Sequence, residues 1–269
     1  MPALLAVQRV PLRMVLGAPE DIEGLSVYRG GTDEGPTLVL VHGFGDSAAG
    51  WGQVIGPLAR RHPVVTYDQP GHGESAPADP PLTFVHLSEG LEAVVDSIDG
   101  PVVLIGNSLG GFVALRHALD HPEGVERVVL INSGGLSYPE LEGTLLMPET
   151  REGLALKNKA VFGDAARPMP GFLADAFLER QGEARLQSLW TDLRTPPFHD
   201  LDDELSALTV PVDIIWGTPD GLLPLAGYGE RFETLIPDAR FETLDGCAHV
   251  PQYTCANRLV LLLEQKLAD

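Results

Sequence analysis

A serine, an aspartate and a histidine in this chain have the types and the chain order of a nucleophilic site. Ser108 lies in "VVLIGNSLGGFVAL", residues 102–115, where β-branched residues give way to an apolar helical pattern. A serine hydroxyl becomes a strong nucleophile when a histidine removes its proton and an acid orients that histidine. The chemistry that these residue types predict is attack by Ser108 on an ester-like carbonyl.

Glycines surround Ser108 in a pattern that indicates a sharp turn. Gly106 and Gly110 lie two positions before and after it, which gives G-x-S-x-G between a predicted strand and a predicted helix. Such a turn, the nucleophile elbow, holds the serine in a backbone conformation that costs about 1–3 kcal/mol. The strand and the helix then pass so closely that side chains at the two glycine positions would collide. The alternative is a helix N-cap serine beside a plain glycine turn.

His249 and Asp220 are the predicted base and acid. His249 lies in "LDGCAHVPQ", after the last predicted strand and before an apolar terminal helix, so its loop returns to the carboxyl edge of the sheet. Asp220 lies in "IIWGTPDGLLP", directly after another strand, although Asp-Gly is also an ordinary turn dipeptide. The order Ser108, Asp220, His249 is the order associated with this elbow. Asp245 is too close to His249 in sequence to be the first choice.

Two backbone N–H groups are predicted to stabilise a negative charge on the substrate oxygen. The elbow supplies one, the N–H of Leu109 at the start of the helix. The loop after the third strand supplies the other, because "VLVHGFGDS" places Phe44 between Gly43 and Gly45. Glycine on either side allows the backbone to turn its N–H towards a substrate. Phe44 and Leu109 are therefore the predicted oxyanion hole.

Short β-branched runs alternate with amphipathic helical patterns along most of the chain, which predicts a parallel sheet covered by helices on both faces. Two further edge strands are predicted at the start, over about 5–15 and 25–29, which makes a mostly parallel eight-stranded sheet. The core runs are Thr37–Val41, Val64–Tyr67, Val102–Ile105, Val128–Ile131, Val212–Trp216 and Arg240–Leu244.

The strand pattern lapses between residues 134 and 207, where two helical stretches are separated by prolines. A segment of this length is too long for an ordinary connection. We interpret 134–207 as a helical cap inserted between two core strands, with 1–133 and 208–269 forming the core. Ligands of open α/β sheets bind outside the carboxyl ends of the strands, so a cap there would cover the site.

Composition narrows the possible partners and compartments. The chain has 269 residues, of which 44% are hydrophobic, and its formal net charge is −20. So acidic a surface repels nucleic acid and anionic membranes, so neither is an expected partner. The N-terminus is a poor signal peptide, and two cysteines, Cys247 and Cys255, cannot staple a fold of this size. These features predict a cytoplasmic protein with no metal site.

The chain resembles the α/β-hydrolase superfamily over nearly its whole length. The elbow, "YDQPGHGES" at 67–75, "WGTPDGLLP" and "GCAHVPQ" occur in the order and at the spacing typical of its small members. The resemblance implies Ser108 as nucleophile, His249 as base, Asp220 as acid, and Phe44 and Leu109 as oxyanion donors. His42 and Asp68 would have structural roles. No cofactor or metal is implied, and the partner is a small-molecule substrate.

The predicted function is a carboxylesterase acting on small to medium apolar esters by acyl transfer. "GNSLGG" also resembles the elbows of hydrolases that cleave carbon–carbon bonds in aromatic ring-fission products, although Val250 follows His249 where those enzymes often have tryptophan. Cofactor-free haloperoxidases share the motifs closely. A hydrolase fold used only for binding remains an alternative of another class. Cap residues proposed to line the pocket are Leu136, Leu145, Leu146, Met147, Phe162, Phe172, Phe177 and Trp190.

A dinucleotide-binding fold is the remaining alternative. "GFGDSA", 43–48, satisfies G-x-G-x-x-A after a strand, and Asp68 ends the next strand, where a ribose-binding acid would lie. Gly50 and Gly52 weaken the helix that should bind pyrophosphate. This reading also leaves Ser108, Asp220 and His249 unexplained.

Overall fold

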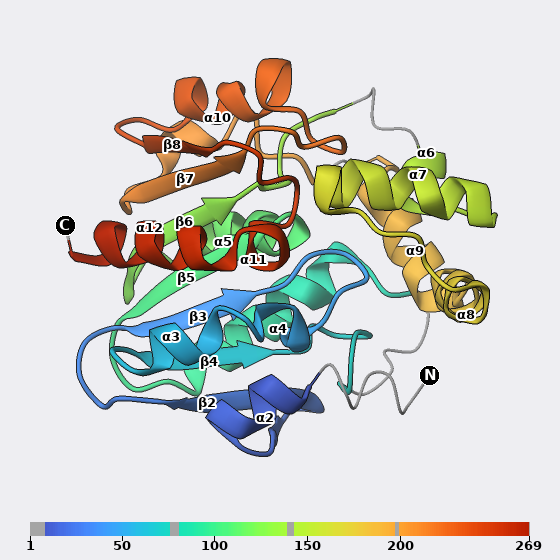
Figure 1. Ribbon diagram of the computed structural model, residues 1–269. Coiled ribbons are helices and arrows are strands. Elements are labelled where there is room, and N and C mark those ends of the chain that lie inside the picture. The colour runs from blue at the N-terminus through green and yellow to red at the C-terminus, as the bar shows by residue number, and fades with distance from the viewer. Residues whose placement is uncertain (1–8, 76–80, 139–142, 197–198, 269) are drawn as a thin grey trace.

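The computed structural model describes residues 9–75, 81–138, 143–196 and 199–268 of the chain. Their strands form one eight-stranded sheet in the order β1-β2-β4-β3-β5-β6-β7-β8 (Figure 1). β2 pairs antiparallel with β1 and β4, and every other pair is parallel. The predicted mostly parallel eight-stranded sheet is confirmed. The strands are β1 (Glu20–Ile22), β2 (Leu25–Gly31), β3 (Thr37–Val41), β4 (Pro63–Tyr67), β5 (Val102–Asn107), β6 (Val125–Ile131), β7 (Val212–Gly217) and β8 (Arg240–Leu244).

Helices cover both faces of the sheet, which explains the near-continuous apolar runs in its central strands. In β5, Val102 and Leu104 point into one hydrophobic core, whereas Val103 and Ile105 point into the other. The first core also contains residues of α4 (Phe84–Asp96), α5 (Leu109–Asp120) and α10 (Glu230–Leu235). The second contains residues of α2 (Val10–Leu16), the 3-10 helix η1 (Ala48–Trp51), α3 (Ile55–Ala59) and α12 (Ala256–Ala268).

The first predicted edge strand is wrong where the structure describes it. Residues Val10–Leu16 form helix α2, and the part of the prediction before residue 9 lies outside the described residues. Pro11 suits the first turn of a helix, because its missing N–H is unsatisfied there in any residue. Leu12 and Leu16 are buried, whereas Met14 between them is 82% exposed. A strand would place all three side chains on one face, so this burial pattern fits the helix. The edge hairpin is instead β1 and β2, joined at Glu23 and Gly24, which both have positive φ.

Between β6 and β7 the described residues form helices and no strand. Figure 1 shows α7, α8 and α9 grouped beyond the ends of the strands. The N–H of Phe84 at the start of α4 donates to Asp192 Oδ2 of α9 (2.7 Å), which attaches this group to the core. The elements are α6 (Gly143–Leu146), α7 (Arg151–Phe162), η2 (Gly163–Ala165), α8 (Gly171–Gln181), α9 (Ala184–Leu193) and η3 (Leu205–Ala207). The boundaries 134 and 207 of a cap remain predictions.

Two short elements complete the carboxyl-terminal part. The turn η4 (Leu225–Gly229) precedes α10, and α11 (Pro251–Thr254) precedes α12. No helix in the described ranges is both long and apolar enough to cross a membrane.

Candidate active site

Ser108 is the single residue between β5 and α5. Its backbone has φ 55° and ψ −122°, a region that non-glycine residues rarely enter. Its N–H donates to the carbonyl of Ile131 (3.1 Å) on β6, and its own carbonyl accepts from the N–H of Gly134 (2.9 Å). Hydrogen bonds to β6 and to the loop that follows it therefore hold the strained residue in place, as an elbow requires.

The two elbow glycines are required by close backbone approach. A Cβ at Gly106 would lie 2.4 Å from the carbonyl oxygen of Gly110, across the turn. A Cβ at Gly110 would lie 2.2 Å from the carbonyl oxygen of Val41 on β3. Both distances are far inside van der Waals contact with backbone that cannot move aside. The N-cap alternative is not supported, because Ser108 makes no side-chain cap hydrogen bond.

His249 and Asp220 are brought together from two loops at the carboxyl edge. The Nδ1 of His249 lies 2.7 Å from Asp220 Oδ2, and both side chains are buried. Asp220 Oδ1 accepts two backbone N–H groups, from Leu222 (2.8 Å) and Leu223 (2.9 Å). An ionised carboxylate has no proton to donate, so it can only accept from the histidine. Nδ1 therefore carries the proton, and Nε2 of His249 is left as the acceptor.

Asn132 also holds Asp220, and sequence reasoning did not identify it. Its Nδ2 donates to Asp220 Oδ2 (2.8 Å) and to the carbonyl of Gly217 (3.2 Å). Its Oδ1 accepts the N–H of Gly217 (2.9 Å), at the end of β7. Asn132 has φ 43°, a conformation that asparagine tolerates better than most residues. An asparagine directly after a core strand was the available signal, but its partner is 88 residues away.

Asn107, the residue before Ser108, supports the loop that carries His249. Its Nδ2 donates to the carbonyl of His249 (2.9 Å), and its Oδ1 accepts from Gln252 Nε2 (2.8 Å). All three side chains are buried. The side chain next to the nucleophile therefore fixes the backbone of the predicted base.

The loop containing Phe44 lies beside Ser108. A Cβ at Gly43 would be 3.1 Å from Ser108 Cβ, which measures how closely this loop passes the elbow. His42 Nε2 accepts the N–H of Gln69 (3.0 Å), so its Nδ1 carries the proton and donates to the carbonyl of Gly43 (2.8 Å). Burial lowers the pKa of His42 to about 3, so the ring is neutral at pH 7. His42 fixes the loop rather than titrating within it.

A cavity of about 430 Å³ lies beside the proposed nucleophile and base. Ser108, His249, Phe44 and Leu109 all line it, whereas Asp220 lies behind His249. Most of its wall is apolar, with polar side chains from Ser137, Tyr138, Arg194, Asp200 and Tyr228 among the rest. Of the proposed pocket residues, Leu136, Leu146 and Trp190 contribute, whereas the side chain of Phe172 is 74% exposed to solvent.

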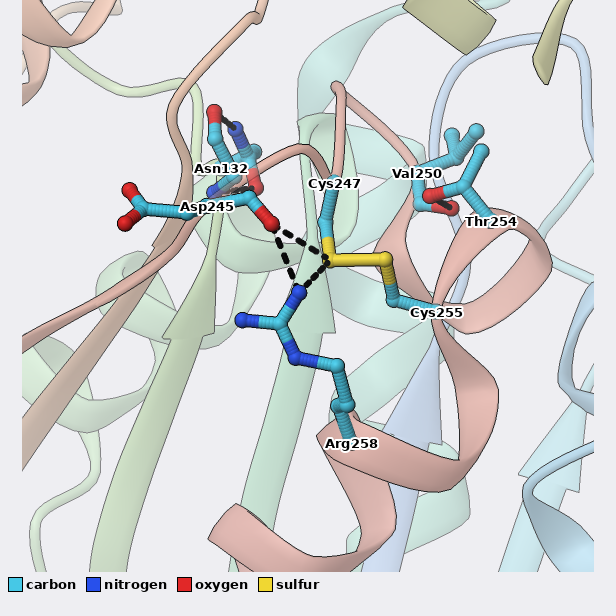
Figure 2. The surroundings of a disulfide bond; sticks show 8 residues. Asn132, Asp245, Cys247, Val250, Thr254, Cys255 and Arg258 are labelled. Carbon is cyan, nitrogen blue, oxygen red and sulfur yellow. Dashed lines mark hydrogen bonds between the residues drawn. A yellow bond between two sulfur atoms is a disulfide. The ribbon is translucent and has the colours of Figure 1, made fainter. Parts of the chain in front are cut away.

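The cysteines differ from the sequence interpretation. Cys247 and Cys255 form a disulfide (Figure 2). Cys247 lies two residues before the predicted base, His249, and Cys255 lies six residues after it. Cys247 lies on the loop after β8, and Cys255 lies between α11 and α12. Two cysteines cannot staple the fold as a whole, but they form this local link. Disulfides persist mainly in oxidising compartments, so this one weighs against the predicted cytoplasmic location.

The dinucleotide alternative does not fit the structure. Asp68 is fully buried and accepts from the guanidinium of Arg9 (2.7 Å) and from the N–H groups of Ala48 (2.8 Å) and Glu74 (2.7 Å). It therefore has no face for a ribose. The glycine run leads into η1, a four-residue 3-10 helix, rather than an α-helix that could bind pyrophosphate. Among the described residues, no group of three or more His, Cys, Asp or Glu side chains could hold a metal ion.

Comparison with known proteins agrees with this fold. The model of the alpha/beta hydrolase family matches residues 38–260, so the chain belongs to that family. A 2-hydroxy-6-oxononadienedioate/2-hydroxy-6-oxononatrienedioate hydrolase of Cupriavidus pinatubonensis is 31% identical, over 84% of this chain and 85% of that protein. A pimeloyl-[acyl-carrier protein] methyl ester esterase of Nitrosomonas europaea is 28% identical, over 84% and 93%.

Among solved structures, one described as a membrane phospholipase A superimposes with a TM-score of 0.82 and 25% sequence identity. The match covers 98% of this chain and 91% of that one. The fold is therefore shared over almost the whole chain.

Proposed function

We propose that this protein is a serine hydrolase that works by acyl transfer, with Ser108 as nucleophile, His249 as base and Asp220 as the orienting acid. His249 Nε2 takes the proton of the Ser108 hydroxyl as its oxygen attacks an ester carbonyl. The N–H groups of Phe44 and Leu109 stabilise the resulting oxyanion. The histidinium then protonates the leaving alcohol, and water hydrolyses the acyl-enzyme with His249 again as base.

The observation that carries the proposal is the hydrogen bond between His249 Nδ1 and Asp220 Oδ2 beside a cavity that Ser108 also lines. Asp220 is held by Asn132 and two backbone donors, so the acid is positioned before a substrate arrives. A purely binding member of the fold would not need this arrangement.

The apolar cavity supports small to medium apolar esters as substrates. Phe44 and Trp190 lie edge to face in its wall, with ring centroids 6.3 Å apart. A volume of about 430 Å³ is within the range of small-molecule sites. The methyl ester esterase among the relatives supports ester chemistry.

Carbon–carbon bond hydrolysis is the second candidate, because one of the relatives most similar in sequence is named as a dienedioate hydrolase. Cofactor-free haloperoxidase chemistry stays a weaker proposal. Two further points are also proposals. One is the position of the cap boundaries. The other is that the partner is a small-molecule substrate rather than nucleic acid or a membrane. The cytoplasmic location also stays a prediction, and the disulfide weighs against it.

A substrate panel tests the choice between the two reactions. Purified protein is assayed with p-nitrophenyl esters of increasing acyl length and, separately, with a ring-fission dienoate. We expect ester turnover with a maximum at short to medium acyl chains. Turnover of the dienoate alone would replace the esterase proposal by the second candidate. The Ser108→Ala variant, which lacks the proposed nucleophile, is assayed on the same panel. Ser88→Ala, which removes a serine hydroxyl on α4 away from the cavity, is its matched control.

A further inference from the structure

The Cys247–Cys255 disulfide encloses the proposed base. The two cysteines are eight residues apart, and His249 is two residues after the first. A cross-link over so short a loop removes less chain entropy from the unfolded state than one over a long loop. In the folded protein it constrains the segment that carries His249.

The remaining contacts of this segment are unevenly distributed. Gln252 and the His249 carbonyl bond to Asn107, and the hydroxyl of Tyr253 donates to Asp46 Oδ1 (2.9 Å). These contacts begin at His249 and continue along α11. Before His249, the Cys247 N–H donates to the carbonyl of Leu244 (3.2 Å). The disulfide is a covalent link from the residues just before His249 to Cys255 at the end of α11, and Arg258 of α12 adds a hydrogen bond to the carbonyl of Asp245.

Arg258 makes the two sulfurs chemically unequal. Its Nη1 donates to the carbonyl of Asp245 (2.6 Å) and lies 3.5 Å from Cys247 Sγ, as Figure 2 shows. Cys247 is fully buried, whereas Cys255 is partly exposed. A guanidinium beside a sulfur stabilises its thiolate. A thiolate that attacks from solvent therefore reaches Cys255 and displaces Cys247 as the better leaving group.

From this placement, and resting on the proposed function, we propose that Cys247 and Cys255 are redox-sensitive positioning residues for His249. The disulfide holds the histidine in line with Ser108, and reduction by a dithiol lowers turnover. The dithiol's thiolate bonds to Cys255 Sγ, and the electron pair of the broken S–S bond passes to Cys247 Sγ. The second thiol of the reagent then displaces Cys255. The reagent becomes a cyclic disulfide, and its two protons pass to the cysteines.

The test compares oxidised and reduced protein on one ester substrate. The wild type is treated with dithiothreitol, desalted without oxygen, assayed, and then reoxidised. We expect kcat to fall about tenfold with KM nearly unchanged, because misplacing a reacting group lowers the rate without weakening binding. Reoxidation should restore kcat. The double variant Cys247→Ala, Cys255→Ala should have the low kcat. Its kcat should not change with dithiothreitol, because these two are the cysteines of the chain.

Three results would overturn the proposal. The first is an unchanged kcat in reduced wild type whose alkylation confirms two free thiols. The second is a loss of activity that follows only a loss of folded protein, measured by circular dichroism at the assay temperature. The third is two alkylatable thiols in protein never exposed to reductant. If oxidised wild type neither hydrolyses esters nor reacts with a fluorophosphonate, the proposed function itself fails, which is a distinguishable outcome.

The role of Arg258 is tested by the rate of reduction rather than by activity. Arg258→Gln should be reduced by dithiothreitol several-fold more slowly than wild type, because Cys247 loses its stabilised thiolate. Arg61→Gln, a change of an exposed arginine on the same face near α12, is the control and should be reduced at the wild-type rate. Equal rates for the two variants would contradict the assigned polarity of the disulfide.

Discussion

At the scale of single residues, the proposed chemistry depends on side chains that were predictable and on others that were not. Ser108, Asp220 and His249 have recognisable neighbours in sequence, and the structure brings the last two into contact. Asn132 and Asn107 fix the acid and the base, yet each bonds to a partner many residues away. Such roles depend on the positions of whole strands, which local sequence does not contain.

Asn132→Ala should lower kcat of the proposed hydrolase about 10-fold to 100-fold with little change in KM. The substitution removes one donor from Asp220 and both hydrogen bonds to Gly217, so the carboxylate no longer holds the His249 ring in one orientation. Steady-state kinetics on a p-nitrophenyl ester provides the measurement. Asn257→Ala, on the exposed face of α12, is the control. A wild-type kcat in Asn132→Ala would show that Asp220 needs no such support.

At the scale of elements, the β5–α5 turn could be predicted from the sequence, whereas the short N-terminal helix could not. The elbow was predictable because glycine at two fixed positions has a steric reason that is independent of the rest of the chain. Helix α2 was not, because seven residues carry too little periodicity to separate a helix from a strand. The residue before α2, Arg9, fixes the position of this helix. Its buried guanidinium donates a hydrogen bond to Asp68, which lies directly after β4, far away in the sequence.

Gly110→Ala should lower the free energy of unfolding by about 3 kcal/mol or more, because the added Cβ meets backbone at 2.2 Å. Gly56→Ala is the matched substitution in α3, where the Cβ would make an ordinary 3.6 Å contact with Val15. It should raise the free energy of unfolding by about 0.5–1 kcal/mol, since alanine favours helix. Urea unfolding followed by circular dichroism compares the two. Equal effects would mean that the elbow is not tightly packed.

At the scale of the whole molecule, buried histidines make stability depend on pH. Burial lowers the pKa of His42 and of His72 to about 3, and both rings are inaccessible to solvent. In the unfolded chain a histidine titrates near 6.5. Between these values the unfolded state binds more protons than the folded state. Their contribution to stability is therefore complete above about pH 6.5 and is lost as the pH falls towards 3.

His72→Asn should reduce this pH dependence. Asparagine can still donate to the carbonyl of Pro70, as His72 Nδ1 does at 3.0 Å, but it does not titrate. We expect the slope of unfolding free energy against pH, between pH 6 and 4, to fall by about 1.4 kcal/mol per pH unit relative to wild type. Guanidinium unfolding at several pH values measures it. Parallel curves for the two proteins would contradict neutral burial of His72.

The central claim, that Ser108 is an activated nucleophile, is tested most directly by reaction with a fluorophosphonate followed by mass spectrometry of peptides. The account predicts one covalent adduct per chain, located on Ser108, with no adduct in folded Ser108→Ala and normal labelling of Ser88→Ala. It also predicts much slower labelling in His249→Ala, because the hydroxyl then has no base. Folded wild type that stays unlabelled, or an adduct on another residue, would contradict it.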